Sequence, residues 1–212
     1  RFCLLGNHDE ALVSGASDFN PHARQAVDWT RRILEPRWYH GAARRARWAW
    51  LTALSPQHEE QGFYFYHGSP RDPVREYVLS TDAMLNRDKL QEIFAILEGT
   101  CFVGHTHHPG VFDSNLRWTG LEGESSTRFA FADEGPYIVN VGSVGQPRDG
   151  DNRACYAVLE QDAADRDDVE RRYWKQNDAG RWEKYSTSSW YLIQTRMWAR
   201  ATGSSGRSGG LG

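Results

Sequence analysis

The segment Phe2-Cys3-Leu4-Leu5-Gly6-Asn7-His8-Asp9 decides the fold, because a short apolar run leads directly into residue types that bind metals and move protons. We expect Phe2 to Leu5 to form a buried strand that ends at Gly6, with Asn7, His8 and Asp9 on the loop beyond it. Ligands bind at the carboxyl ends of strands in α/β sheets, so this loop is a candidate functional site. Because the first residue is Arg1 rather than Met, we also expect the chain to be cut at its front.

Two further histidine-bearing segments follow apolar runs in the same way. The aromatic run Phe63 to Tyr66 predicts a strand that delivers His67 at its end. The run Cys101 to Val103 predicts a strand that ends in Gly104-His105-Thr106-His107. Imidazole nitrogens suit Zn, Fe, Mn or Ni, and the amide oxygen of Asn7 adds a harder donor. Two ions about 3.5–4 Å apart would clamp an in-line phosphoryl displacement, so these segments predict a dinuclear metal site.

The rest of the chain alternates predicted helices and strands up to about residue 172. Pro21 suits the first turn of a helix over 20–34. Further helices are expected over 42–54 and 82–97, a loop or irregular hairpin over 113–134, and strands over 137–141 and 154–159. Residues 171–212 show neither a further strand nor a helix. We therefore predict one domain over residues 1–172 and an atypical, poorly ordered tail over residues 173–212.

The composition argues against some classes of partner. The 212 residues carry a formal net charge of −3, so broad capture of nucleic acid or of an anionic membrane is not expected. No stretch approaches the roughly 18–20 apolar residues that span a bilayer. Cys3, Cys101 and Cys155 stand singly in apolar runs, which predicts buried thiols rather than a disulfide framework. These features together predict a soluble cytoplasmic protein, and they make no prediction of an oligomeric state.

The histidine-bearing segments resemble a known family. Gly6-Asn7-His8-Asp9, His67-Gly68 and Gly104-His105-Thr106-His107 resemble the third, fourth and fifth metal-site blocks of the calcineurin-like metallophosphoesterase superfamily. The run 140–148, Asn-Val-Gly-Ser-Val-Gly-Gln-Pro-Arg, is similar to the signature of its small bacterial phosphodiesterase branch. The resemblance covers residues 1 to about 170. It implies an α/β fold, a four-layer α/β/β/α sandwich of two mixed sheets, lacking its first strands and helices.

The resemblance also implies a ligand set. Asn7, His67 and His105 would bind one divalent ion, and His107 would bind a second. The two ions would be Mn, Fe, Zn, Ni or Mg, and a bridging hydroxide would attack the phosphorus of a small phosphate ester. The substrate would be a phosphodiester or a phosphomonoester, such as a dinucleotide polyphosphate or a cyclic nucleotide.

Three more residues are candidates for catalysis and substrate binding. By resemblance, His8 would stabilise the transition state and protonate the leaving oxygen, and Asp9 would orient its ring. Arg148 is a candidate for substrate contact from its own chemistry, because a guanidinium matches the oxygens of a phosphate. An arginine that pairs with Asp149 or Asp151 is an equally ordinary interpretation.

Two blocks of the family pattern do not occur in this sequence. An Asp-x-His and a Gly-Asp-x-x-Asp would supply the remaining ligands and the carboxylate that bridges both ions. The chain keeps three ligands for one ion and one for the other, so we expect it to be inactive, or nearly so, by itself. Two alternatives stay open. One is a non-catalytic metal-binding or regulatory module with the same fold, and the other is a protein serine/threonine phosphatase.

Overall fold

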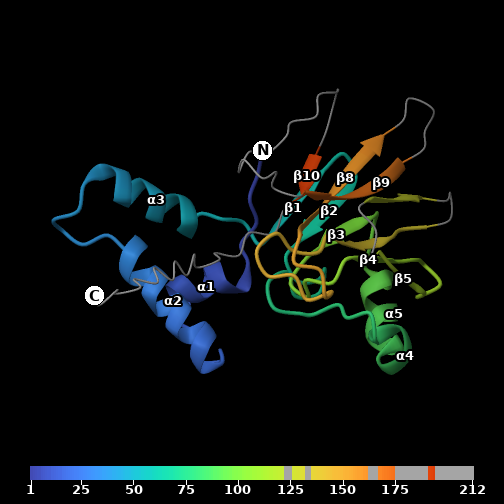
Figure 1. The fold of residues 1–212 in the computed structure, drawn as a ribbon, viewed down its shortest axis with the longest axis horizontal. Helices are drawn as coiled ribbons and strands as arrows, with labels where there is room; N and C mark the ends of the chain where they lie inside the picture. The colour runs from blue at the N-terminus through green and yellow to red at the C-terminus, as the bar shows by residue number, and fades with distance from the viewer. Residues whose placement is uncertain (122–125, 132–134, 162–166, 175–190, 194–212) are drawn as a thin grey trace, which may run out of the picture.

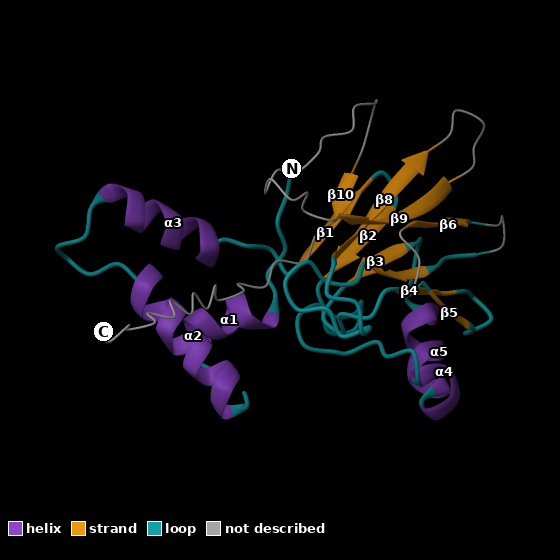
Figure 2. Ribbon diagram, viewed as in Figure 1, coloured by secondary structure: helices purple, strands orange, loops and turns teal. Residues whose placement is uncertain are grey.

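The computed structural model describes residues 1–121, 126–131, 135–161, 167–174 and 191–193 (Figure 1). Three helices lie together on one side of the molecule, and two β-sheets with two short helices make up the other side (Figure 2). The helices are α1 (Asn7–Ser14), α2 (Pro21–Leu34), α3 (Ala42–Thr52), α4 (Asp82–Leu85) and α5 (Arg87–Ala95). The strands are β1 (Gln57–Glu60), β2 (Phe63–Tyr66), β3 (Cys101–Val103), β4 (Gly110–Phe112), β5 (Trp118–Gly120), β6 (Ser126–Ala130), β7 (Ile138–Asn140), β8 (Ala154–Gln161), β9 (Asp167–Trp174) and β10 (Tyr191–Ile193).

The larger sheet is mixed, and its strand order is β1-β2-β3-β7-β4-β5. Strands β2, β3 and β7 run parallel, whereas β1, β4 and β5 pair antiparallel with their neighbours. All residues of β3 and β7 are buried, which explains why these strands read as continuous apolar runs in the sequence. Because β2 and β3 are parallel, the residues that follow them, His67 and Gly104, lie at the same edge of the sheet. The backbone N–H of Gly104 donates to the carbonyl of His67 at 3.0 Å.

The smaller sheet has the order β10-β8-β9-β6, and its described pairings are all antiparallel. The predicted α/β class is confirmed, and the larger sheet is mixed as predicted. The smaller sheet was also predicted to be mixed, but its described strand pairs are antiparallel. The expectation of no strand beyond residue 171 is wrong, because β9 continues to Trp174 and β10 pairs with β8. A strand as short as β10 depends on its partner strand, which a local pattern does not reveal. Most of residues 173–212 lie outside the described residues, so the boundary at residue 172 stays a prediction.

The two faces of the larger sheet are covered by different elements. Phe102 of β3 shares a core cluster with Leu159 of β8, which places the smaller sheet on this face. The next residue, Val103, shares another cluster with Leu90 and Ile93 of α5. Successive side chains of a strand point to opposite faces, so α5 covers the second face. The fourth layer of the predicted sandwich stays a prediction.

The amino-terminal helices form a core of their own. Ala11 of α1, Val27 of α2 and Leu51 of α3 are buried in one cluster. Helix α2 begins where it was predicted, since the Asn20 side chain accepts a hydrogen bond from the Ala23 N–H at 2.9 Å. Helix α3 was also predicted, and it ends at Thr52.

Two predicted elements differ from the structure. Residues 2–5 form no strand but a single parallel bridge, between Leu4 and Ser55. The predicted helix over 82–97 is interrupted at Asn86, whose φ of −141° and ψ of 48° are not helical, and it becomes α4 and α5. Asn86 donates from its side chain to Asp82 Oδ1 at 2.8 Å, and Asn favours such local hydrogen bonds over the helical conformation.

The three thiols do not share one environment. Cys101 and Cys155 are buried as predicted, whereas Cys3 is exposed because residues 2–5 do not enter the sheet. Among the residues that the structure describes, no helix combines the length and the hydropathy that a membrane crossing requires.

Candidate metal centre

Asn7 lies in the first turn of α1 rather than on a loop, because Gly6 is the N-cap residue of this helix. Gly6 is extended, with φ of −92° and ψ of 168°, and its N–H donates to Asp9 Oδ2 at 3.1 Å. A carboxylate in the first turn also complements the positive end of the helix dipole. A Cβ on Gly6 would lie 3.3 Å from the His67 ring, so glycine allows the start of α1 to approach the end of β2 closely.

The imidazole of His67 meets two other polar side chains. His67 Nε2 lies 3.0 Å from Asn7 Oδ1 and 3.1 Å from His105 Nδ1. Adjacent ligands of an octahedral ion are about 3.0 Å apart when each metal–donor distance is about 2.1 Å. The side chains that the family resemblance assigns to one ion thus come together around His67, at distances compatible with adjacent ligands.

The ring of His105 is oriented by a hydrogen bond at one nitrogen and by an aromatic ring that stacks on its face. His105 Nε2 lies 3.1 Å from the carbonyl oxygen of Arg75. A carbonyl only accepts, so Nε2 carries the proton and Nδ1 keeps a lone pair that faces His67. The ring of Tyr77 stacks on the imidazole, with centroids 3.7 Å apart and planes 18° apart. Both contacts fix the direction in which Nδ1 points.

His107 points toward a different loop from His105. Both residues have a left-handed backbone, with φ of 62° at His105 and 63° at His107, which is uncommon for residues other than glycine. The segment therefore bends as it leaves β3. His107 Nδ1 lies 2.6 Å from the carbonyl oxygen of Gln146, so its Nε2 is the nitrogen left to bind an ion.

Burial keeps these imidazoles neutral, which is the form that binds metals. Burial, followed by the charge of His105, lowers the pKa of His67 to about 3. Burial also lowers the pKa of His105 to about 4, although its hydrogen bond to the Arg75 carbonyl acts in the opposite direction. Burial, followed by the charge of Arg148, lowers the pKa of His107 to about 4.

The donor set of the cluster is two imidazoles and an amide. Within the described part of the chain, no group of three or more His, Cys, Asp or Glu side chains could hold a metal ion. The Asn7 amide oxygen lies beside His67, and these two imidazoles with one amide would be a neutral donor set of the kind that suits a borderline divalent ion. For a second ion the structure offers Nε2 of His107, so a dinuclear site stays a proposal.

The two residues predicted to act beside the metals are placed differently from each other. The His8 ring packs edge-on against Phe19, with centroids 4.9 Å apart, and burial, followed by the charge of Arg148, lowers its pKa. Burial raises the pKa of Asp9, whose carboxylate caps Gly6. In the described residues no hydrogen bond joins Asp9 to the His8 ring. The orienting role predicted for Asp9 has no contact to support it here.

Arg148 is exposed, and its charge acts on the histidine cluster. It lowers the pKa of both His8 and His107. Its guanidinium donates to Gln146 Oε1 at 3.4 Å. Asp151, one of the two partners that the alternative interpretation offered, accepts from Arg153 Nε at 2.8 Å. Substrate contact by Arg148 stays a prediction.

Sequence reasoning missed three residues that shape this site, namely Arg75, Tyr77 and Asn140. Arg75 contacts His105 through its backbone carbonyl, and Tyr77 through its ring, so neither belongs to a ligand motif. Asn140 begins the 140–148 run and stands as a polar residue in a predicted apolar strand, which was a signal that could have found its role. The structure buries its side chain. Its amide donates to Gly104 and Thr106, the residues on either side of His105.

The chain is similar in fold to two proteins of known structure. A metallophosphoesterase from Sphaerobacter thermophilus, known from its crystal structure, is 32% identical, with a TM-score of 0.60 over 81% of this chain and 65% of that one. The structure of hypothetical protein PH1004 from Pyrococcus horikoshii shares the fold, at 16% identity and a TM-score of 0.52 over 82% of this chain and 64% of that one.

A curated relative is also similar in sequence. The uncharacterized protein MJ0912 of Methanocaldococcus jannaschii is 27% identical over 165 residues, which cover 74% of this chain and 59% of that protein. No family model matches the chain. The chain thus spans less than two thirds of these relatives, while its fold and its identity to the Sphaerobacter protein agree with the motifs around Asn7, His67 and His105. This chain belongs to the calcineurin-like metallophosphoesterase superfamily.

Proposed function

We propose that this chain is the histidine-bearing part of a metal-dependent hydrolase of phosphate esters. The observation that carries the proposal is the convergence of His67 Nε2 with Asn7 Oδ1 at 3.0 Å and with His105 Nδ1 at 3.1 Å. The 32% identity to a metallophosphoesterase supports it. Because the chain spans 65% of that protein, the activity of the whole protein is part of the proposal.

Each side chain of the cluster has a distinct task in this proposal. A bound ion supplies positive charge that draws electron density from a phosphoryl oxygen. Asn7, His67 and His105 hold that charge in place. His8 donates an N–H hydrogen bond to the ester and, in its protonated form, gives a proton to the leaving oxygen and becomes a neutral imidazole. Arg148 is exposed and binds phosphate oxygens through its guanidinium.

The finer parts of the proposal concern the second ion and the substrate. We propose that His107 binds a second divalent ion and that the substrate is a small phosphodiester or phosphomonoester. The lone pair on His107 Nε2 supports the first statement, since Nδ1 is occupied by the Gln146 carbonyl. The charge of Arg148, which acts on both His8 and His107, supports an anionic substrate between them.

A titration with Co²⁺ tests the metal site. The chain is freed of metal with a chelator, and binding is followed by the visible absorption of Co²⁺. We expect saturable binding that weakens at least about tenfold in His67→Ala. The control is His22→Ala, because His22 is exposed on α2 and belongs to none of the three histidine-bearing motifs, so its loss should change nothing. Equal binding by the His67→Ala variant and by the unsubstituted chain would disprove the site.

An assay of hydrolysis tests the competence of the chain by itself. We expect no measurable hydrolysis of a chromogenic phosphodiester by the 212 residues with Mn²⁺ or Ni²⁺, because the carboxylate ligands of the family pattern do not occur in them. Metal-dependent turnover that His67→Ala abolishes would show that the chain completes its active site in another way.

A non-catalytic metal-binding module is the second candidate function. One observation favours it, namely that the described residues bring only neutral donors together around His67. The same two experiments separate the candidates when they are repeated on the full-length protein in which this sequence occurs. Metal binding with hydrolysis supports the hydrolase, whereas metal binding without hydrolysis of any phosphate ester supports the module.

A further inference from the structure

Arg75 connects two parts of the candidate metal centre. Its backbone carbonyl accepts a hydrogen bond from His105 Nε2 at 3.1 Å. Its guanidinium donates from Nε to Glu10 Oε2 at 2.8 Å and from Nη1 to Asp18 Oδ2 at 2.7 Å. Glu10 lies one turn after Asn7 on α1, and Asp18 follows the helix. A single residue thus contacts both the helix that begins with Asn7 and the ring of His105.

We infer that Arg75 is a positioning residue, which fixes His105 relative to Asn7 and so sets the affinity of the site for a divalent ion. The inference rests on the proposed metal site, and it adds a residue that no ligand motif contains. Arg75 would act through His105 and α1, without contact to the ion or to a substrate.

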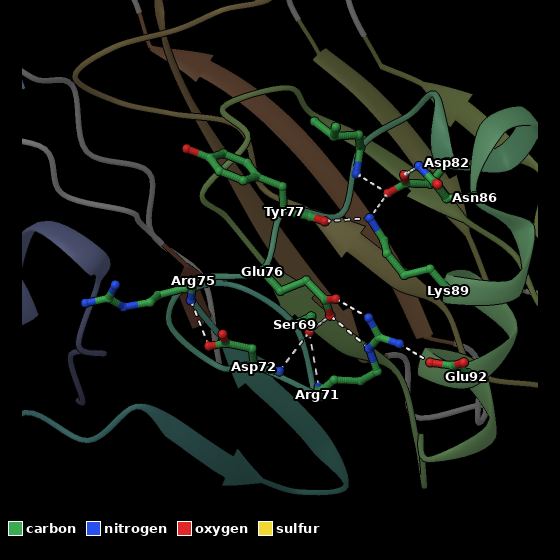
Figure 3. A network of polar contacts seen from close by, with 11 residues as sticks. Ser69, Arg71, Asp72, Arg75, Glu76, Tyr77, Asp82, Asn86, Lys89 and Glu92 are labelled. Carbon is green, nitrogen blue, oxygen red and sulfur yellow. Dashed lines mark hydrogen bonds and ion pairs between the residues drawn. The ribbon is translucent and has the colours of Figure 1, made fainter. Parts of the chain in front are cut away.

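The loop between His67 and Arg75 is compact enough to transmit this constraint. The Gly68 N–H donates to the Pro73 carbonyl at 2.7 Å. Asp72 Oδ1 accepts from the Arg75 N–H at 2.9 Å (Figure 3). A Cβ on Gly68 would lie 2.5 Å from the Asp72 carbonyl oxygen, so the loop is closely packed against its own start. The position of the Arg75 side chain is therefore coupled to the position of the Arg75 carbonyl, which accepts from His105.

The ion pairs of Arg75 are partly exposed, which limits what they do for stability. The Arg75 side chain is 44% exposed, and those of Glu10 and Asp18 are 33% and 52% exposed. Such pairs contribute little to the free energy of unfolding. Metal affinity is more sensitive, because the donors must stay within a fraction of an ångström of the right spacing, and residues that orient ligands control it.

Arg71 provides a matched control in the same loop. Its guanidinium pairs with Glu76 and with Glu92 of α5, and its side chain is 32% exposed (Figure 3). In the close-up, the Arg75 side chain points away from this cluster. Arg71 thus tethers the loop to α5, whereas Arg75 tethers it to α1. Removal of either guanidinium costs two ion pairs, but only Arg75 connects to the helix of Asn7.

The first test compares Co²⁺ binding by Arg75→Ala, Arg71→Ala and Glu10→Gln. We expect the dissociation constant to rise about three- to tenfold in Arg75→Ala and to rise in the same direction in Glu10→Gln. Arg71→Ala should bind as the unsubstituted chain does. The double variant Arg75→Ala/Glu10→Gln should be no weaker than Arg75→Ala, because both changes break the same tether. Circular dichroism and urea unfolding show whether each variant is folded.

A second, metal-free test reads the His105 ring directly. Proton–nitrogen spectra of the histidine side chains are recorded with a chelator at pH 7.5, where these imidazoles are neutral. We expect one tautomer of His105, protonated at Nε2, in the unsubstituted chain and in Arg71→Ala. In Arg75→Ala the Nε2–H signal should broaden or be joined by the Nδ1–H tautomer.

The two tests separate failure of this inference from failure of the metal site. If the unsubstituted chain binds no Co²⁺, the proposed function fails, and the spectra still decide the role of Arg75. An unchanged His105 spectrum in Arg75→Ala would overturn the inference. An Arg71→Ala variant that weakens Co²⁺ binding as much as Arg75→Ala would overturn it as well, because the effect would then belong to the loop in general.

Discussion

Asn140, at the end of β7, donates from its side-chain amide to the hydroxyl of Thr106 at 2.8 Å. The same amide nitrogen donates to the Gly104 carbonyl at 2.9 Å, and Oδ1 accepts from the Gly142 N–H at 3.0 Å. Asn140 thus contacts the residues on both sides of His105, whose backbone has the strained φ of 62°. One buried amide holds the bend on which the histidine cluster depends.

Replacing Asn140 tests this dependence. Asn140→Ala removes three buried hydrogen bonds, to the Gly104 carbonyl, the Thr106 hydroxyl and the Gly142 N–H, so we expect a loss of about 2–3 kcal/mol in the free energy of unfolding. Urea denaturation measures it, and Asn115→Ala, at an exposed position, is the control and should change it by less than about 0.5 kcal/mol. A small, equal effect of both substitutions would show that Asn140 does not hold the bend.

Asp9 should act as a helix cap. Its carboxylate accepts from the Gly6 N–H, so Asp9→Ala should lower the free energy of unfolding by about 1 kcal/mol. Asp9→Asn keeps an oxygen that can accept, and it should lose less. Thermal or urea unfolding of the two variants distinguishes them. If Asp9 instead orients His8, the His8 ring signals in proton–nitrogen spectra will change in both variants, and we expect no such change.

Lys89 and Asp82 form an ion pair beside the site. Asp82 is fully buried and pairs with Lys89, whose Nζ also donates to the Tyr77 carbonyl at 2.8 Å (Figure 3). Lys89→Met would leave a buried carboxylate without its cation, and we expect it to cost about 3 kcal/mol in urea unfolding. The double variant with Asp82→Asn should recover part of this loss, since the uncompensated charge is then gone. A double variant that is less stable than Lys89→Met would show that the uncompensated charge of Asp82 does not cause the loss.

The three thiols should differ in reactivity. At pH 8 we expect a disulfide reagent to modify Cys3 rapidly and the buried Cys101 and Cys155 only on unfolding. Burial raises the pKa of the Cys101 thiol, so the folded state keeps a proton that the unfolded state releases above about pH 8.5. The contribution of this thiol to stability is therefore present below that pH and is lost as the pH rises. Three thiols that react at one rate in the native protein would refute the burial.

Local signals along the chain are sufficient to locate several elements of the fold. Helix α2 was predicted because Asn20, Pro21 and the apolar period are all encoded within one segment. Strands β2 and β3 were predicted because strands covered on both faces read as apolar runs. The interruption at Asn86 was not predicted, because its cause is a hydrogen bond to the buried Asp82, and burial is a property of the folded chain.

The sequence by itself identified the candidate ligands, since Asn7, His67, His105 and His107 belong to motifs that resemble metal-site blocks and can be read along the chain. Only the tertiary structure decided that Asn7, His67 and His105 meet within hydrogen-bonding distance, and which ring nitrogen of His105 and of His107 remains available. The physical reason is that the chemical type of each side chain is fixed by the covalent sequence. The orientation of that side chain depends on hydrogen-bonding groups that distant segments contribute. The backbone carbonyls of Arg75 and Gln146 are such groups. Because every residue has a backbone carbonyl, a sequence motif cannot indicate which one will accept a hydrogen bond.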